Sequence, residues 1–128
     1  MPGARRLAAT RPGPDGSLRS LMMASQAGDN QAYRQLLTAI VMRSMEACAQ
    51  AVSRNEMDAA DVDECICRVL HMVHAALATF DPKYSIDVWL FAIISAQLAQ
   101  SRRQHRARLH ETGAHAAANW YRRLLKQK

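Results

Sequence analysis

The chain has 128 residues and a formal net charge of +6, and 49% of its residues are hydrophobic while only 5% are aromatic. This length allows one domain with a small core, and a composition rich in Ala, Leu and Met favours helices over strands. No apolar run reaches the roughly 20 residues that span a bilayer, and the N-terminus lacks the apolar stretch of a signal peptide, so we expect no membrane partner. Three cysteines without a framework spacing indicate reduced thiols in a cytoplasmic protein.

The first predicted elements are a flexible leader and two helices. Residues 1–17 are rich in Gly and Pro, which predicts a leader without regular structure. A short helix should begin at Leu18 and end at Gly28, the usual helix terminator, and Asp29 is suited to cap a longer helix that reaches about Arg54. The apolar residues of this longer helix form one stripe at three- and four-residue spacing: Tyr33, Leu36, Leu37, Ile40, Val41, Met45, Cys48 and Val52.

An amphipathic helix with an acidic start is predicted next. Asp58 should cap it, with Asp61 and Asp63 in the first turn, where carboxylates suit the positive end of the helix dipole. The helix should end before Asp81-Pro82, because a residue that precedes proline disfavours helical geometry. Its predicted core face comprises Val62, Ile66, Val69, Leu70, Val73, Leu77 and Phe80. Its predicted outward face comprises Asp61, Glu64, Arg68, Met72 and Ala75.

The last predicted elements are a long helix and a short one. Ser85 should cap the long helix, whose stretch VWLFAIISAQLA is apolar on nearly all sides and should therefore be wrapped by other helices. From Ser101 the helix becomes basic, and Gly113 should end it. A final short basic helix within residues 114–128 should place Trp120, Tyr121 and Leu124 on one side.

These elements predict an all-α fold: a compact bundle of three principal helices with a short leading helix over residues 18–110, followed by a short basic C-terminal helix at residues 114–128. Charge is unevenly distributed along it. Residues 58–81 carry five acidic residues against one arginine, whereas residues 82–128 carry nine Lys and Arg against two acidic residues. Neighbouring patches of opposite charge indicate either partners of opposite sign or solvated helix faces.

Three sequence blocks between Leu18 and Arg108 follow one another in a characteristic order. The first comprises Ala24, Ala27, Gly28, Asp29, Ala32 and Leu36; the second comprises Asp63 and Glu64 with Ala76, Leu77, Phe80 and Asp81; the third comprises Trp89, Leu90, Phe91 and Ile93. With the basic run that follows, they resemble the second conserved region of extracytoplasmic-function sigma factors. That region is the helical domain that bacterial RNA polymerase uses to start transcription.

The resemblance implies a protein that binds RNA polymerase core and promoter DNA, with no cofactor and no catalytic activity of its own. In this family an acidic helix docks on the clamp of the largest polymerase subunit, a loop captures a flipped-out base of the minus-ten strand, and a basic helix holds the strand backbone. The polymerase- or partner-binding residues would be Asp61, Asp63, Glu64 and Arg68. The DNA-binding residues would be Lys83, Tyr84, Ser85 and Ile86 in the loop and Arg102, Arg103 and Arg106 on the basic helix.

The chain departs from the family pattern at positions that matter for those contacts. Cys67 and Arg68 stand where the family usually has Gln-Glu, and Ala96 and Gln100 stand where it usually has Asn and Asp. A reversed charge on a docking surface can cost several kcal/mol. The alternative is therefore a degenerate sigma-like regulator that binds a protein, such as an anti-sigma factor, without recognising a promoter.

A metal site and an enzyme are the remaining alternatives. Cys67, His71 and His74 lie on one side of the acidic helix and are candidate ligands for a zinc-like ion, although one straight helix cannot surround a tetrahedral ion. The five histidines of the chain do not pair with a nucleophile in a recognisable pattern, so we expect no enzyme.

Overall fold

The computed structural model describes residues 15–126, and within this range it is helical and contains no strand. Its helices are α2 (Asp15–Gln26), α3 (Asn30–Ser53), α4 (Val62–Ala76) and α5 (Ile86–Lys126), with two short 3-10 helices, η1 (Ala59–Asp61) and η2 (Leu77–Thr79). The predicted all-α fold is confirmed. The predicted leader lies outside the described residues up to position 14, and α2 begins at Asp15 rather than at Leu18. None of the described helices is long and apolar enough to cross a membrane.

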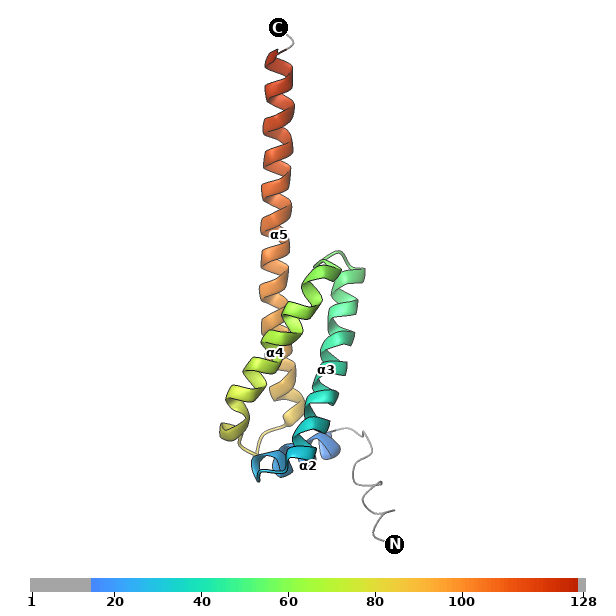
Figure 1. Cartoon of the computed structure of the whole chain (residues 1–128), viewed down its shortest axis with the longest axis vertical. Helices are drawn as coiled ribbons and strands as arrows, with labels where there is room; N and C mark the ends of the chain where they lie inside the picture. Colours follow the sequence, from blue (N-terminus) through green and yellow to red (C-terminus); the bar gives the residue numbers. More distant parts are fainter. Residues whose placement is uncertain (1–14, 127–128) are drawn as a thin grey trace.

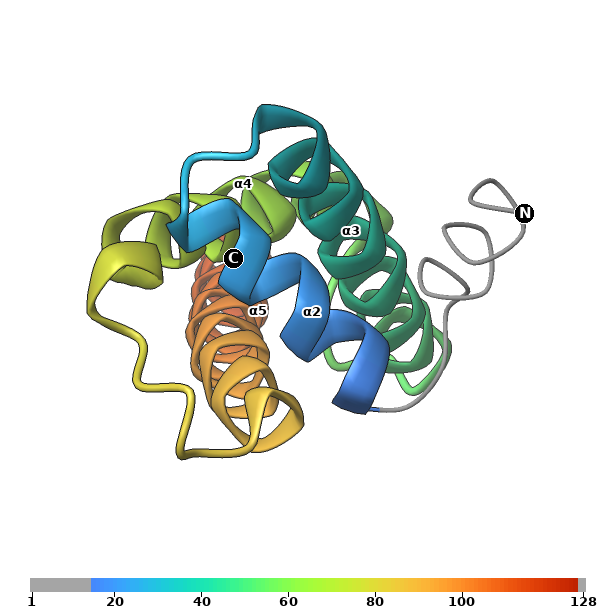
Figure 2. The ribbon, with the colours of Figure 1, turned by 90° about the horizontal axis from the view of Figure 1, so that it is seen from below.

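Three helices pack side by side, and the fourth covers one end of them. α3, α4 and the first half of α5 form the bundle, while the second half of α5 projects beyond it (Figure 1). Figure 2 shows α2 lying across the end of the bundle that also carries the connection from α4 to α5. The fully buried core draws on every helix: Met22 from α2, Leu36, Ile40 and Cys48 from α3, Cys65, Val69 and Val73 from α4, and Ile86 and Leu90 from α5.

The predicted caps explain where α2 and α3 end and begin. Gly28 has a φ of +96°, a left-handed conformation that closes α2 and favours glycine. One carboxylate oxygen of Asp29 then accepts hydrogen bonds from the backbone N–H groups of Gln31 and Ala32, at 3.0 and 3.1 Å. At its other end α3 is closed by Asn55, whose φ of 59° is also left-handed. Asparagine is the residue that most often replaces glycine in this role.

The buried stripes differ from the predicted ones by a small rotation of each helix. On α3, Ser44 is buried whereas Met45 is 53% exposed. Burial of Ser44 is tolerated because its hydroxyl donates to the carbonyl of Ile40 at 2.7 Å and needs no other partner. On α4, Cys65 is buried although it was not among the predicted core residues. Asp58 does not cap α4, which begins at Val62 after η1.

Cys48 and Cys65 face each other inside the bundle. Burial raises the pKa of the Cys48 thiol to about 12, and the neighbouring Cys65 adds to this rise. Cys48 therefore stays protonated at neutral pH, and its thiol is a packing group rather than a nucleophile or a metal ligand.

Helix α5 departs most from the prediction. Gly113 does not end it; a single helix of 41 residues continues to Lys126. A terminating glycine needs a positive φ, as at Gly28, whereas a helical glycine costs only about 1 kcal/mol relative to alanine. The apolar start of α5 is also not wrapped on all sides, because Val88 and Phe91 are 67% and 72% exposed.

Candidate nucleic-acid interface

The loop between α4 and α5 is fixed by side chains of α2. The guanidinium of Arg19 donates to the backbone carbonyls of Pro82 and Tyr84. The amide of Gln26 donates to the carbonyls of Leu77 and Phe80 at 2.9 and 2.8 Å. These four bonds tie the end of η2 and the loop that follows it to α2. The loop that the sequence resemblance assigns to base reading is therefore held in one conformation.

Residues of the loop itself complete this arrangement. A carboxylate oxygen of Asp81 accepts from the backbone N–H of Lys83 at 2.9 Å, a turn that aspartate favours. The hydroxyl of Ser85 accepts from the backbone N–H of Val88 at 3.4 Å, so Ser85 lies at the start of α5 as predicted. Lys83 and Tyr84 remain exposed, Tyr84 to 67%.

A shallow pocket lies beside the loop. It has a volume of about 450 Å³ and is lined by Thr79, Phe80, Asp81, Tyr84, Ser85, Val88 and Trp89. Phe80 and Trp89 form its aromatic wall, with ring centroids 5.0 Å apart and planes inclined at 55°. Tyr84 stands at its exposed edge. Aromatic rings beside an open pocket are the groups on which single-stranded bases stack, at about 1–3 kcal/mol per base.

One exposed face of α5 leads away from this pocket. With 3.6 residues per turn, Val88, Ala92, Ala96, Arg103 and Arg106 fall on the same side of the helix, and all five are exposed. The face is smooth in its middle because of the two alanines and ends in two cations. None of the ion pairs within residues 15–126 involves Arg103 or Arg106. Both guanidinium groups are therefore free to bind phosphate.

The other arginines of this segment bind within the molecule. Arg102 donates to Glu56 at 2.8 Å, and Arg108 pairs with Asp61 and lies 3.6 Å from Asp58. These contacts join α5 to the connection between α3 and α4. Arg102 and Arg108 are partly exposed, at 39% and 47%, but their guanidinium groups are engaged by acidic residues of the chain itself.

The acidic start of α4 is smaller than predicted. Asp63 and Glu64 are exposed, but the side chain of Asp61 is only 15% exposed because it pairs with Arg108. Arg68 does not face outward either: its side chain is 19% exposed. Its guanidinium binds Glu64 at 3.0 Å, the hydroxyl of Ser101 at 2.6 Å and the side chain of Gln97 at 3.1 Å. Arg68 therefore joins α4 to α5.

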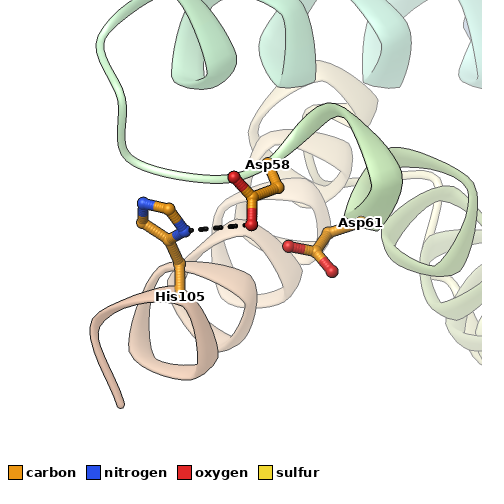
Figure 3. Close-up of side chains that lie close together, drawn as sticks. All are labelled: Asp58, Asp61 and His105. Atoms are coloured by element: carbon orange, nitrogen blue, oxygen red, sulfur yellow. Dashed lines mark ion pairs between the residues drawn. The ribbon is translucent and has the colours of Figure 1, made fainter. Parts of the chain in front are cut away.

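The structure does not bring the predicted metal ligands together. Cys67, His71 and His74 are all exposed, and the Nδ1 atom of His74 is hydrogen-bonded to the hydroxyl of Tyr33 at 2.7 Å. Within residues 15–126, the one group of three potential ligands whose donor atoms lie within 4.8 Å of one another is Asp58, Asp61 and His105 (Figure 3).

Two pairs of residues that shape these regions were not predicted from the sequence. Arg19 and Gln26 carry a weak signal, since they are polar residues two turns apart on a helix that must cover the bundle. Asp58 and His105 carry none, because they lie far apart in the sequence and meet only where α5 passes the connection between α3 and α4.

No protein-family model, no curated protein and no solved structure matches this chain.

Proposed function

We propose that this chain is a sigma-like domain that binds RNA polymerase core and a single promoter strand. The observation that carries this proposal is the pocket beside the α4–α5 loop. It has the aromatic wall of Phe80 and Trp89, it lies where the sequence resemblance expects base reading, and it shares Val88 with the face of α5 that ends in Arg103 and Arg106.

The pocket and the two arginines would bind different parts of the strand, as their chemistry suggests. One base, taken out of its stack, would occupy the pocket against Phe80, Tyr84 and Trp89, where stacking offsets the cost of unpairing. The following phosphates would run along the alanine face of α5 to the two arginines. From Val88 to Arg106 this face measures about 27 Å, at about 1.5 Å per residue, which is long enough for several nucleotides.

The strand-binding half of the proposal is tested by fluorescence anisotropy with a labelled single-stranded minus-ten oligonucleotide at several salt concentrations. Tyr84→Ala should weaken binding by about 1–3 kcal/mol through lost stacking. Arg103→Ala with Arg106→Ala should reduce the salt slope by about 1.4, since each single-strand phosphate contact contributes about 0.7.

Arg102 provides the matched control for the arginine pair. It lies on the same helix and has the same charge, but it binds Glu56. Arg102→Ala should therefore leave the salt slope nearly unchanged. If the salt slope is unchanged when Arg103 and Arg106 are replaced, or falls equally in Arg102→Ala, this face does not bind DNA.

The polymerase-binding half depends on Asp63 and Glu64, the exposed carboxylates at the start of α4. Pull-down with purified polymerase core should retain the wild-type chain and lose Asp63→Lys, because a basic partner repels the new charge. Glu46→Lys, an equal charge change on the exposed side of α3, should be retained. If neither form is retained, the polymerase role fails while strand binding stands.

A second candidate function is that of a regulator that binds a protein partner. The observation that favours it is a groove of about 690 Å³ between α3 and α5, lined among others by Ala47, Val88, Phe91 and Leu98. Phe91 is 72% and Val88 is 67% exposed there, and neighbouring exposed apolar side chains are typical of a protein interaction site. The occupant we propose is the apolar face of a partner helix, which suits a groove between two helices. Loss of partner capture in Phe91→Ala, with strand binding intact, would favour this function.

A further inference from the structure

Three side chains from two parts of the chain converge near the middle of α5. Asp58 and Asp61 lie at the two ends of η1, and neither carboxylate makes a capping hydrogen bond there. His105 comes from α5. One donor atom from each residue lies within 4.8 Å of the other two, and Figure 3 shows the His105 ring facing the carboxylate of Asp58, with that of Asp61 beside it.

Hydrogen bonding sets the orientation of the imidazole. The Nε2 atom of His105 lies 3.1 Å from the backbone carbonyl oxygen of Asn55. A carbonyl only accepts, so Nε2 carries the proton, and in the neutral ring Nδ1 is left with a lone pair. A histidine that binds a metal through one nitrogen usually donates from the other to a carbonyl or carboxylate.

The other ring nitrogen lacks a hydrogen-bond partner. The side chain of His105 is 9% exposed, and its Nδ1 is the one buried side-chain nitrogen or oxygen in the described part of the chain without a hydrogen bond. It lies 3.6 Å from Oδ2 of Asp58, too far for a hydrogen bond. A lone pair facing a carboxylate oxygen is unfavourable unless a cation, either a proton or a metal ion, lies between them.

The distance between Nδ1 of His105 and Oδ2 of Asp58 fits a metal ion bound between them. Zinc binds imidazole nitrogen at about 2.0–2.1 Å and carboxylate oxygen at about 2.0–2.2 Å, so two such ligands at a tetrahedral angle lie about 3.4 Å apart. The observed separation of 3.6 Å is close to this value. We propose that Asp58, Asp61 and His105 bind a divalent transition-metal ion of the zinc class, with water completing the coordination.

Arg108 is the competing cation at this site. Its guanidinium donates to Asp61 and lies 3.6 Å from Asp58. Its side chain is 47% exposed, so it can move toward solvent or bind the second oxygen of Asp61. Bound metal would join α5 to the connection between α3 and α4 more firmly than the guanidinium does, because it coordinates residues of both segments directly.

The test uses the full chain purified without a histidine tag and stripped with a chelator. Zinc chloride titrated by calorimetry should bind with one ion per chain. Asp58→Asn and Asp61→Asn should each weaken binding at least about tenfold, and His105→Gln should abolish it. Arg108→Gln should strengthen binding by removing the competing charge. The Asp58 side chain is 59% exposed, so Asp58→Asn reports on the site even if His105→Gln fails to fold.

Matched controls come from the residues on the outer side of α4. Cys67→Ser and His71→Gln should leave zinc affinity unchanged. Cobalt bound in place of zinc should give visible bands of a nitrogen–oxygen site without a thiolate charge-transfer band. Absence of stoichiometric binding would overturn the proposal, as would binding that is lost in Cys67→Ser and retained in Asp58→Asn. The proposal is independent of the polymerase and DNA roles.

Discussion

Helix α5 contains two stretches that share a continuous helical backbone but differ in the burial of their side chains. The inner stretch, residues 86–105, buries Ile86, Leu90, Ile94 and Leu98 against the bundle. In the outer stretch, residues 106–126, every residue is exposed, including large apolar ones: Leu109, Trp120, Tyr121, Leu124 and Leu125. Figure 1 shows the outer stretch projecting alone.

This difference in burial shows that a segment can be helical without contributing to the stability of the fold. Most helical stability in proteins comes from packing an apolar face, and an isolated helix is marginal in water. The inner stretch has such a face, whereas the outer one depends on intrinsic propensity and on its continuity with the inner stretch. Substitutions in the inner stretch should therefore change the global free energy of unfolding, and substitutions in the outer stretch should change local helicity only.

The largest expected effect is at Leu90, which is 1% exposed. Leu90→Ala should lower the free energy of unfolding by about 2–5 kcal/mol, because it removes a buried side chain and leaves a cavity. Leu109→Ala, the same change at a residue that is 58% exposed, should shift it by less than about 0.5 kcal/mol. Urea unfolding followed by circular dichroism measures both. Equal losses would mean that the outer stretch is packed in solution.

Arg68 comes next, because it connects the inner stretch to α4. Arg68→Ala should cost about 1–3 kcal/mol, since it removes the hydrogen-bond partner of Ser101, which is 1% exposed, and also the contact with Gln97. Arg103→Ala removes the same charge from an exposed position and should leave the urea midpoint unchanged. If Arg68→Ala leaves the free energy of unfolding unchanged, Arg68 lies at the surface in solution. The sequence-based expectation that it faces a partner would then be supported.

Local chemistry explains how much of this fold could be predicted. Gly28, Asp29 and Ser85 act through neighbours within a few residues, so the sequence predicts the ends of helices there correctly. The all-α fold follows from the same patterns. Gly113 shows the limit of such reasoning: glycine permits a helix end, but only backbone context decides whether it makes one.

The candidate sites depended more on tertiary structure. The position of the loop at Lys83 and Tyr84 could be predicted, because a proline and a capping serine enclose it. The inward turn of Arg68 and Asp61 could not be predicted, because a helical wheel places residues relative to an axis and not relative to a neighbouring helix. The contacts of His105 with Asn55 and Asp58 could not be predicted either, because these residues lie 50 and 47 positions earlier in the sequence.

Gly113 allows the outer stretch to be altered without touching the bundle. Beyond the backbone of the helix itself and the two neighbouring residues, no atom lies within 4 Å of a Cβ placed there, so Gly113→Ala should stabilise local helix by about 1 kcal/mol. Amide exchange in the outer stretch should slow while the urea midpoint stays unchanged. Gly28→Ala is the matched control, and it should destabilise the whole domain because Gly28 has a φ of +96°. A raised urea midpoint in Gly113→Ala would show that the two stretches unfold together.

The smallest expected effect lies where the two stretches meet. Glu56 pairs with Arg102 at 2.8 Å, and both side chains are more than a third exposed, so Glu56→Gln should cost no more than about 1 kcal/mol. Because salt screens exposed charges, this difference from the wild-type chain should shrink toward zero in about 1 M salt, whereas the loss in Leu90→Ala should persist. Glu46→Gln, an exposed residue of α3 without a described ion pair, should have no effect at any salt concentration. A loss of unfolding free energy in Glu56→Gln that persists at high salt would mean that Glu56 stabilises the end of the inner stretch through packing rather than through its charge.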